Sequence, residues 1–192
     1  MKKLYSLLLC FGLLQYSIAQ TLINPVTGGG FDAGNTFAAN GWSVVNSSGN
    51  EWVVGTAADP APPSPPNTAY ISIDGNPANY SYDNTTTHIS HFYQKVTIPA
   101  NAYNVVLSFQ LKGNNEFDWD NFILHDGLWI SADPTLTVPT ADALPGGGAY
   151  VQWFQFDPNV TYIGQTVTLD GLAGQTVYLI FSWINDNDGA GD

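Results

Sequence analysis

The sequence predicts an all-β protein in which two antiparallel sheets pack face to face as a sandwich. Short segments alternate apolar and polar residues, which is the pattern of strands with one buried face. No stretch of the 192 residues sustains the 3.6-residue apolar period of an amphipathic helix. Glycine, asparagine, aspartate and proline fill the gaps between the segments. Many short strands without helices are typical of jelly-roll and immunoglobulin-like sandwiches.

The first nineteen residues are predicted to be a secretory signal peptide that is removed from the fold. Lys2 and Lys3 precede an apolar run over residues 7–14, and small residues follow as far as Ala19. The apolar run is too short to cross a bilayer. Cleavage is expected after Ala19, which leaves residues 20–192 as a single domain of a secreted or cell-surface protein.

The charge of the remaining chain excludes several classes of partner. The full chain has 16 acidic residues against four basic ones, and its formal net charge is −12. Once Lys2 and Lys3 are removed, only Lys95 and Lys112 stay basic. Nucleic acid and anionic membranes would be repelled, whereas divalent cations would be attracted. Cys10 leaves with the signal peptide, so an exported domain without disulfides needs a large core or a bound metal.

Nine segments carry the alternating strand pattern. In 104–112, odd-numbered apolar residues from Val105 to Leu111 face one way. In 175–185, the same alternation places Val177, Leu179, Phe181 and Trp183 on one face. The remaining predicted strands, in chain order, fall within 41–46, 51–56, 68–73, 90–98, 121–131, 150–156 and 165–169.

Two long loops and an abrupt end complete the predicted layout. Residues 58–68 contain five prolines and cannot form a central strand. Residues 132–150 contain a triple glycine, and long loops of this kind often carry function. After the strand at 175–185 the chain runs through an acidic turn and stops. Because a sandwich usually closes with one more strand, we expect an N-terminal fragment of a longer protein that lacks its final strand.

Six motifs in order give the chain a family resemblance. They are "GGGFDAGNTFAANGWSVVN", "EWVVGT", "AYISID", "SHFYQKVTIPA", "LSFQLKGNNEFDWDNFIL" and "FSWINDND", the last with its "W.ND" turn, and they span residues 28–188. The chain resembles the adhesin-like jelly-roll module of secreted Bacteroidetes proteins, called the cleaved-adhesin or choice-of-anchor J domain and related to eukaryotic MAM domains. It departs from that pattern where the final strand is missing, and where Asp32 replaces the usual glutamate.

The resemblance implies adhesion or binding rather than catalysis. Such modules often lie near the N-terminus of a large chain, before fibronectin type III repeats and a C-terminal sorting domain for type IX secretion. Those downstream domains of the same chain, extracellular glycans and host or surface proteins are therefore the expected partners. Relatives of the fold often hold a structural calcium ion between the first and last strands. By that resemblance, Asp32 is the first candidate ligand for Ca²⁺.

Three further acids lie close together in "NNEFDWDN". Glu116, Asp118 and Asp120 are candidate calcium ligands, because carboxylate oxygens suit this hard cation. If 118–124 is one extended strand, Asp118 and Asp120 share a face at the rim of the core. The acids of the terminal "DND" are further possible contributors. The alternative interpretation is that these acids bind no metal and only keep a turn in contact with water, as runs of acids in turns usually do.

The alternative function is a hydrolase. In that case the cluster of Glu116, Asp118 and Asp120 would supply the pair of catalytic carboxylates. Glycoside hydrolysis needs two carboxylates held roughly 5–10 Å apart, and acids two positions apart on a strand reach the lower end of that span. Nucleophilic catalysis is less supported, because no serine lies in a G-x-S-x-G elbow. His88 and His91 are expected on opposite faces of a strand, and His125 in a turn before "DG".

Aromatic side chains are the candidate ligand-binding residues. Sugar rings pack on exposed aromatic rings, and aromatic residues form 14% of the chain, including six tryptophans. Most fall on strand patterns and are expected in the core. Tyr80, Tyr82, Trp119 and Trp129 are the candidates for exposed, ligand-binding rings, although packing in the core or on a sheet is the favoured interpretation for each of them. The sequence thus favours a non-catalytic, calcium-stabilised adhesion or carbohydrate-binding module. A structural spacer domain is the second alternative.

Overall fold

The fold was analysed in a computed structural model of the chain. It describes residues 19–57, 66–113, 116–118, 123–146, 152–153 and 161–187. The described chain consists of ten strands and one short 3₁₀ turn, η1 (Ala38–Asn40). Within these residues, no helix has the length and apolar character needed to cross a membrane. The all-β prediction is therefore confirmed.

Nine of the ten strands overlap the predicted segments, whereas β6 falls outside them. Their bounds are β1 (Ser43–Val45), β2 (Glu51–Gly55), β3 (Thr68–Ser72), β4 (His88–Thr97), β5 (Val106–Leu111), β6 (Glu116–Asp118), β7 (Ile123–Asp133), β8 (Gln152–Trp153), β9 (Ile163–Thr168) and β10 (Thr176–Asn185). Every strand pairing in the structure is antiparallel. An isolated bridge between Ser72 and Ser81 is parallel.

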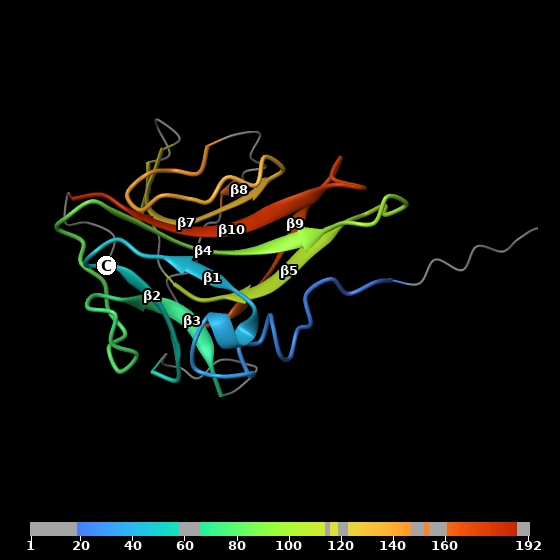
Figure 1. The fold of residues 1–192 in the computed structure, drawn as a ribbon. Coiled ribbons are helices and arrows are strands. Elements are labelled where there is room, and N and C mark those ends of the chain that lie inside the picture. The colour runs from blue at the N-terminus through green and yellow to red at the C-terminus, as the bar shows by residue number, and fades with distance from the viewer. Residues whose placement is uncertain are drawn as a thin grey trace, which may run out of the picture.

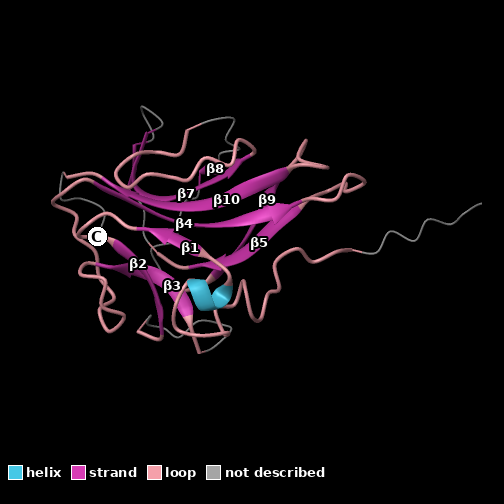
Figure 2. Cartoon of the chain, in the orientation of Figure 1, coloured by secondary structure: helices cyan, strands magenta, loops and turns pink. Residues whose placement is uncertain are grey.

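One large sheet and two small ones form two layers (Figure 1). The large sheet has the order β1-β4-β10-β7-β6, and β8 also pairs with β7. The two-stranded sheets β2-β3 and β5-β9 lie on the opposite side of the core, as Figure 2 shows. Buried residues from all three sheets belong to one hydrophobic cluster, so the layers pack face to face. The jelly-roll type of this sandwich stays a prediction.

An aromatic cluster occupies the centre of the core. Phe92 of β4 lies parallel to Phe181 of β10, with ring centroids 4.7 Å apart and planes 7° apart. Trp52 of β2 meets the edge of Phe92 at 4.8 Å and so joins the two layers. Four more rings, those of Phe31, Phe37, Trp42 and Phe109, surround this pair. The predicted inward face of β10 is thereby confirmed.

The start of β7 differs from the sequence prediction. β6 and β7 pair antiparallel, with Phe117 opposite Leu124 and Asp118 opposite Ile123. The chain therefore reverses direction between Asp118 and Ile123, so the single extended strand expected over 118–124 is wrong. The turn expected at His125 is also wrong, because β7 continues through it to Asp133.

Candidate functional site

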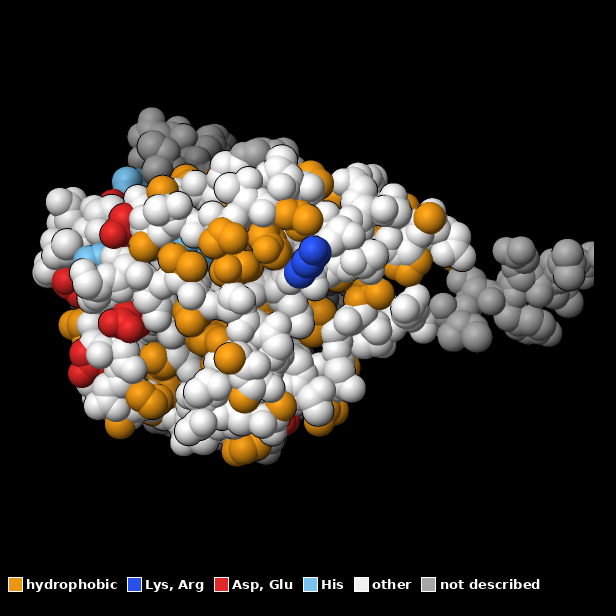
Figure 3. Space-filling model, viewed as in Figure 1, with side chains coloured by type: hydrophobic (Ala, Val, Ile, Leu, Met, Phe, Trp, Pro, Cys, Tyr) orange, Lys and Arg blue, Asp and Glu red, His pale blue; other side chains and the backbone are white. Residues whose placement is uncertain are grey.

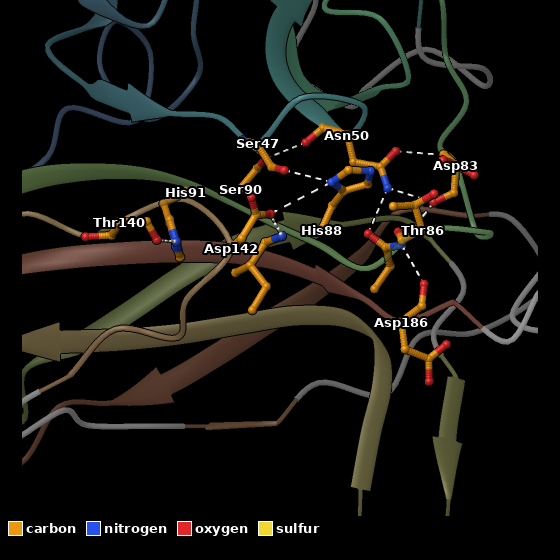
Figure 4. Close-up of polar contacts among 12 residues, drawn as sticks. Ser47, Asn50, Asp83, Thr86, His88, Ser90, His91, Thr140, Asp142 and Asp186 are labelled. Carbon is orange, nitrogen blue, oxygen red and sulfur yellow. Dashed lines mark hydrogen bonds and ion pairs between the residues drawn. The ribbon is translucent and has the colours of Figure 1, made fainter.

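Polar side chains gather at the end of the sandwich where β4 begins and β10 ends. The turn "SSGN" enters β2 here, and the acidic turn after β10 leaves it. Strand alternation ends at these turns, so side chains that hydrogen-bond the backbone replace apolar ones. We call this group the polar end: Ser47, Asn50, Asp83, His88, Ser90, Asp126, Asp142, Asn185 and Asp186. Figure 4 shows the polar contacts among most of it, with Ser47, Asn50, Asp83, His88, Ser90, Asp142 and Asp186 labelled. Carboxylate and histidine side chains also gather at this end in Figure 3.

Two buried amides hold the polar end together. Asn50 and Asn185 expose none of their surface. Asn50 Nδ2 donates to Asn185 Oδ1 at 2.7 Å and to the Asp83 carbonyl at 2.7 Å, while Asn50 Oδ1 accepts the Asp83 amide at 2.7 Å. Asn185 Nδ2 donates to the carbonyls of Asp83 and Thr86. The two amides therefore fix the segment before β4 onto the ends of β2 and β10.

A buried carboxylate makes the second link. Asp126 is 1% exposed, and its Oδ1 accepts the Asp186 amide at 2.9 Å. Its Oδ2 accepts the Tyr82 hydroxyl at 3.1 Å. Nearby, the Asp186 carboxylate lies 2.6 Å from His125 Nδ1. These bonds join β7, the end of β10 and the loop that contains Tyr82.

The serine, histidine and aspartate of the polar end do not form a catalytic triad. Ser47 Oγ lies 2.7 Å from His88 Nδ1, and Asp142 Oδ1 lies 3.8 Å from the same nitrogen. A triad needs its serine and its carboxylate on different ring nitrogens. Ser47 is also buried, at 3% exposed. This geometry anchors a loop rather than activating a nucleophile.

Local hydrogen bonds lower the pKa values of two carboxylates of the polar end, those of Asp83 and Asp142. Burial tends to raise the pKa of Asp142, but hydrogen bonds from the Ser47 hydroxyl and the Ile89 amide outweigh it, so the pKa is lowered. The Thr85 hydroxyl and amide lower the pKa of Asp83. Both carboxylates therefore serve as charged acceptors for nearby loops.

The predicted metal ligands fall in two places. Asp32 is half-buried, and its Oδ1 is buried without a hydrogen-bond partner in the described chain. Glu116 and Asp118 belong to β6, where Glu116 lies opposite Asp126 in the register, and their side chains are outside the description. Asp120 lies outside the described residues. Among the side chains that are described, no three of histidine, cysteine, aspartate or glutamate are grouped to hold a metal ion.

The predicted aromatic ligand residues differ in exposure. Tyr80 is 42% exposed. Tyr82 is half-buried, with its ring 5.2 Å from Trp183 in an edge contact. Trp129 is half-buried on the large sheet, opposite Trp153 of β8. Trp119 lies outside the described residues. Tyr80 is thus the exposed member of this predicted set in the described chain.

Tyr80 sits in a group that we call the tyrosine patch, formed by Tyr70, Tyr80, Lys112 and Tyr162. The Tyr80 ring meets the buried Tyr70 ring edge-on at 5.8 Å, and Lys112 Nζ lies 4.8 Å from its centroid. Burial raises the pKa of Tyr162, and Tyr80 raises it further. Burial also raises the pKa of Tyr70, so the phenols of Tyr70 and Tyr162 are neutral at physiological pH.

The loop that presents Tyr80 is held rigidly. Asp74 accepts bonds from the Ser72 hydroxyl, the Asn76 amide and Asn79 Nδ2, at 2.7–3.1 Å. The Asn76 amide is the main reason that the pKa of Asp74 is lowered. Tyr70 donates its hydroxyl to the Pro77 carbonyl. The loop therefore holds its shape before any ligand arrives.

Sequence analysis missed most of the residues that build these sites. Asn50 and Asn185 are single polar residues at strand ends, and Asp126 is a single acid within β7. No local pattern separates them from solvated turn residues. Lys112 offered one usable signal, because Lys95 and Lys112 are the only lysine or arginine residues after residue 19 of the sequence. Comparisons of the chain with protein-family models, with curated proteins and with solved structures found no match.

Proposed function

We propose that the chain is a non-catalytic extracellular adhesion or glycan-binding module that binds its ligand at the tyrosine patch. The observation that carries the proposal is the exposed ring of Tyr80, braced by Tyr70 and Lys112 on a preformed loop. Sugar C–H faces pack on such rings, and a rigid loop lowers the ordering cost of binding. Asn76 and Asn79, which precede Tyr80 in the same loop, are the proposed source of amides for sugar hydroxyls.

Replacing Tyr80 by alanine is expected to weaken glycan binding at least about tenfold, which corresponds to about 1.4 kcal/mol. Binding is measured by calorimetry with oligosaccharides selected on a glycan array. Tyr103→Ala is the matched control, because Tyr103 is 67% exposed and lies near the opposite end of β5. Equal losses in both variants, or no glycan bound by the intact domain, would favour the structural spacer instead.

We also propose that calcium stabilises the module, with Asp32 as one ligand. A carboxylate oxygen that is buried and accepts no hydrogen bond carries an uncompensated cost, which a cation would remove. Glu116, Asp118 and Asp120 are kept as the second group of candidate ligands. When bound, calcium would neutralise negative charge in a strongly acidic chain.

Calcium at a hundredfold excess over its dissociation constant is expected to raise the free energy of unfolding by about 2.7 kcal/mol relative to chelator. The measurement is a pair of melting curves of the mature domain. Asp32→Asn should abolish the difference, whereas the exposed Asp170→Asn should keep it. Superimposable curves for the parent protein with calcium and with chelator would reject the role of calcium.

A further inference from the structure

His91 is a titratable group buried on the outer face of the large sheet. It exposes none of its surface. Its Nε2 lies 3.0 Å from the Thr140 carbonyl, and its Nδ1 lies 2.8 Å from Ser182 Oγ. A carbonyl only accepts, so Nε2 carries the proton, and in the neutral ring Nδ1 accepts the Ser182 hydroxyl. Both ring nitrogens are therefore satisfied in the neutral form.

The loop over residues 134–146 covers this face through contacts with β4. In addition to the bond from His91 to Thr140, the Asp142 amide donates to the Ile89 carbonyl at 2.9 Å, and Asp142 Oδ1 accepts the Ile89 amide at 3.1 Å. Ser131, Ile180 and Ser182 on the same face are fully buried. Exposed Val138 and Leu144 flank the contact region on the loop. The loop is thus a cover that contacts β4 through Thr140 and Asp142.

We propose that loop 134–146 is a pH-sensitive lid, which protonation of His91 releases from the outer face of the large sheet. A proton on Nδ1 turns this nitrogen into a donor, so the Ser182 hydroxyl loses its acceptor. The imidazolium would also be buried under the lid. Lifting the loop returns His91 to water, where the charged ring is stable.

The groups around His91 support the inference that protonation of His91 favours the open lid. Burial lowers the pKa of His91, while the Thr140 and Ala143 carbonyls and the Asp142 carboxylate oppose the shift. The neighbouring strands contribute neutral partners in the register, Val45 from β1 and Ser182 from β10. Further groups near the lid are Trp129 and Ser131 of β7, and His88, whose Nδ1 is 3.8 Å from Asp142 Oδ1.

The sign of the pH dependence follows from linkage. The pKa of His91 is lower under the closed lid than in the open form, so the open form binds more protons as the pH falls. The free energy that favours the closed lid has its full value above the ordinary histidine pKa of about 6.5, and it decreases as the pH falls below that value. At pH 5.5 the opening constant is expected to rise by up to about tenfold.

The test is native-state hydrogen exchange of the mature domain between pH 7.5 and 5.5, reported as protection factors. Protection of the Asp142 amide should fall by up to about tenfold, while that of Phe181 in the centre of β10 stays constant. His91→Gln keeps a donor for the Thr140 carbonyl but does not titrate, so its protection should not change with pH. His88→Gln should keep the fall in protection.

Three results would overturn the lid. One is an unchanged protection of Asp142 in the parent protein, and another is the same pH dependence in His91→Gln. The third is a parallel loss at Phe181, which would indicate global unfolding. Should His91→Gln not fold, NMR titration of the parent protein decides instead. A His91 ring that protonates at about 6.5 while Asp142 stays protected contradicts the proposal.

Discussion

Replacing Phe92 by alanine is expected to lower the free energy of unfolding by about 3–5 kcal/mol, which is among the largest losses that one substitution causes. Phe92 is 5% exposed and lies parallel to Phe181 at 4.7 Å. It also touches Trp52 of the opposite layer at 4.8 Å. The substitution removes the contact between the layers and leaves a cavity. Urea unfolding at pH 7, followed by tryptophan fluorescence, measures the loss.

Two variants separate the central role of Phe92 from a general effect of removing a ring. Phe92→Leu retains most of the apolar volume and should cost less than Phe92→Ala. Tyr103→Ala removes an exposed ring and should change the stability by no more than about 0.5 kcal/mol. A loss below about 1 kcal/mol for Phe92→Ala would show that the two layers are not joined through this cluster.

The strands were predictable because burial of one face imposes a period of two on the sequence. In β10, Val177, Leu179, Phe181 and Trp183 alternate with other residues, and all four belong to the core. The alternation identifies the inward face of a strand without any knowledge of its partners. It does not identify the order of strands in a sheet, because β4, β10 and β7 come together from distant parts of the chain.

Local sequence gave two conflicting predictions at His125, a strand within 121–131 and a turn before "DG", and could not decide between them. An aspartate followed by glycine is a strong turn signal, and "HDG" was interpreted in this way. In the fold, Asp126 instead accepts bonds from Tyr82 and Asp186, which are 44 and 60 residues away. These tertiary bonds satisfy the carboxylate inside the sandwich and outweigh the local preference for a turn.

The exposure of the aromatic residues was only partly predictable. Tyr80 and Tyr82 belong to the same short segment, "ANYSYDN", and sequence analysis treated them alike. The structure separates them, because Tyr82 packs on Trp183 while Tyr80 faces solvent beside Lys112. Two residues that are two positions apart can differ in exposure when a buried acceptor from a distant part of the chain, here Asp126, holds one of them. Period and composition carry no information about such partners.

Replacing Asn185 by alanine is expected to lower the free energy of unfolding by about 2–4 kcal/mol. Asn185 and Asn50 are fully buried and bonded to each other across 135 residues of sequence. The substitution leaves the Thr86 carbonyl and one hydrogen of Asn50 Nδ2 without their partners, and each such buried group costs about 1–3 kcal/mol. Chemical denaturation at pH 7 measures the loss, and the exposed Asn101→Ala should be close to neutral.

The same variant tests whether the polar end positions the tyrosine patch. Asn50 and Asn185 both hold the Asp83 carbonyl, and Tyr82 next to it is fixed by Asp126. Loosening these bonds frees the segment that contains Tyr80, so glycan affinity should fall in conditions where Asn185→Ala is still fully folded. Calorimetry with the glycan used for Tyr80→Ala measures this effect. Undiminished affinity in folded Asn185→Ala would mean that Tyr70 and Lys112 position Tyr80 without the buried amides, and that the polar end contributes to stability alone.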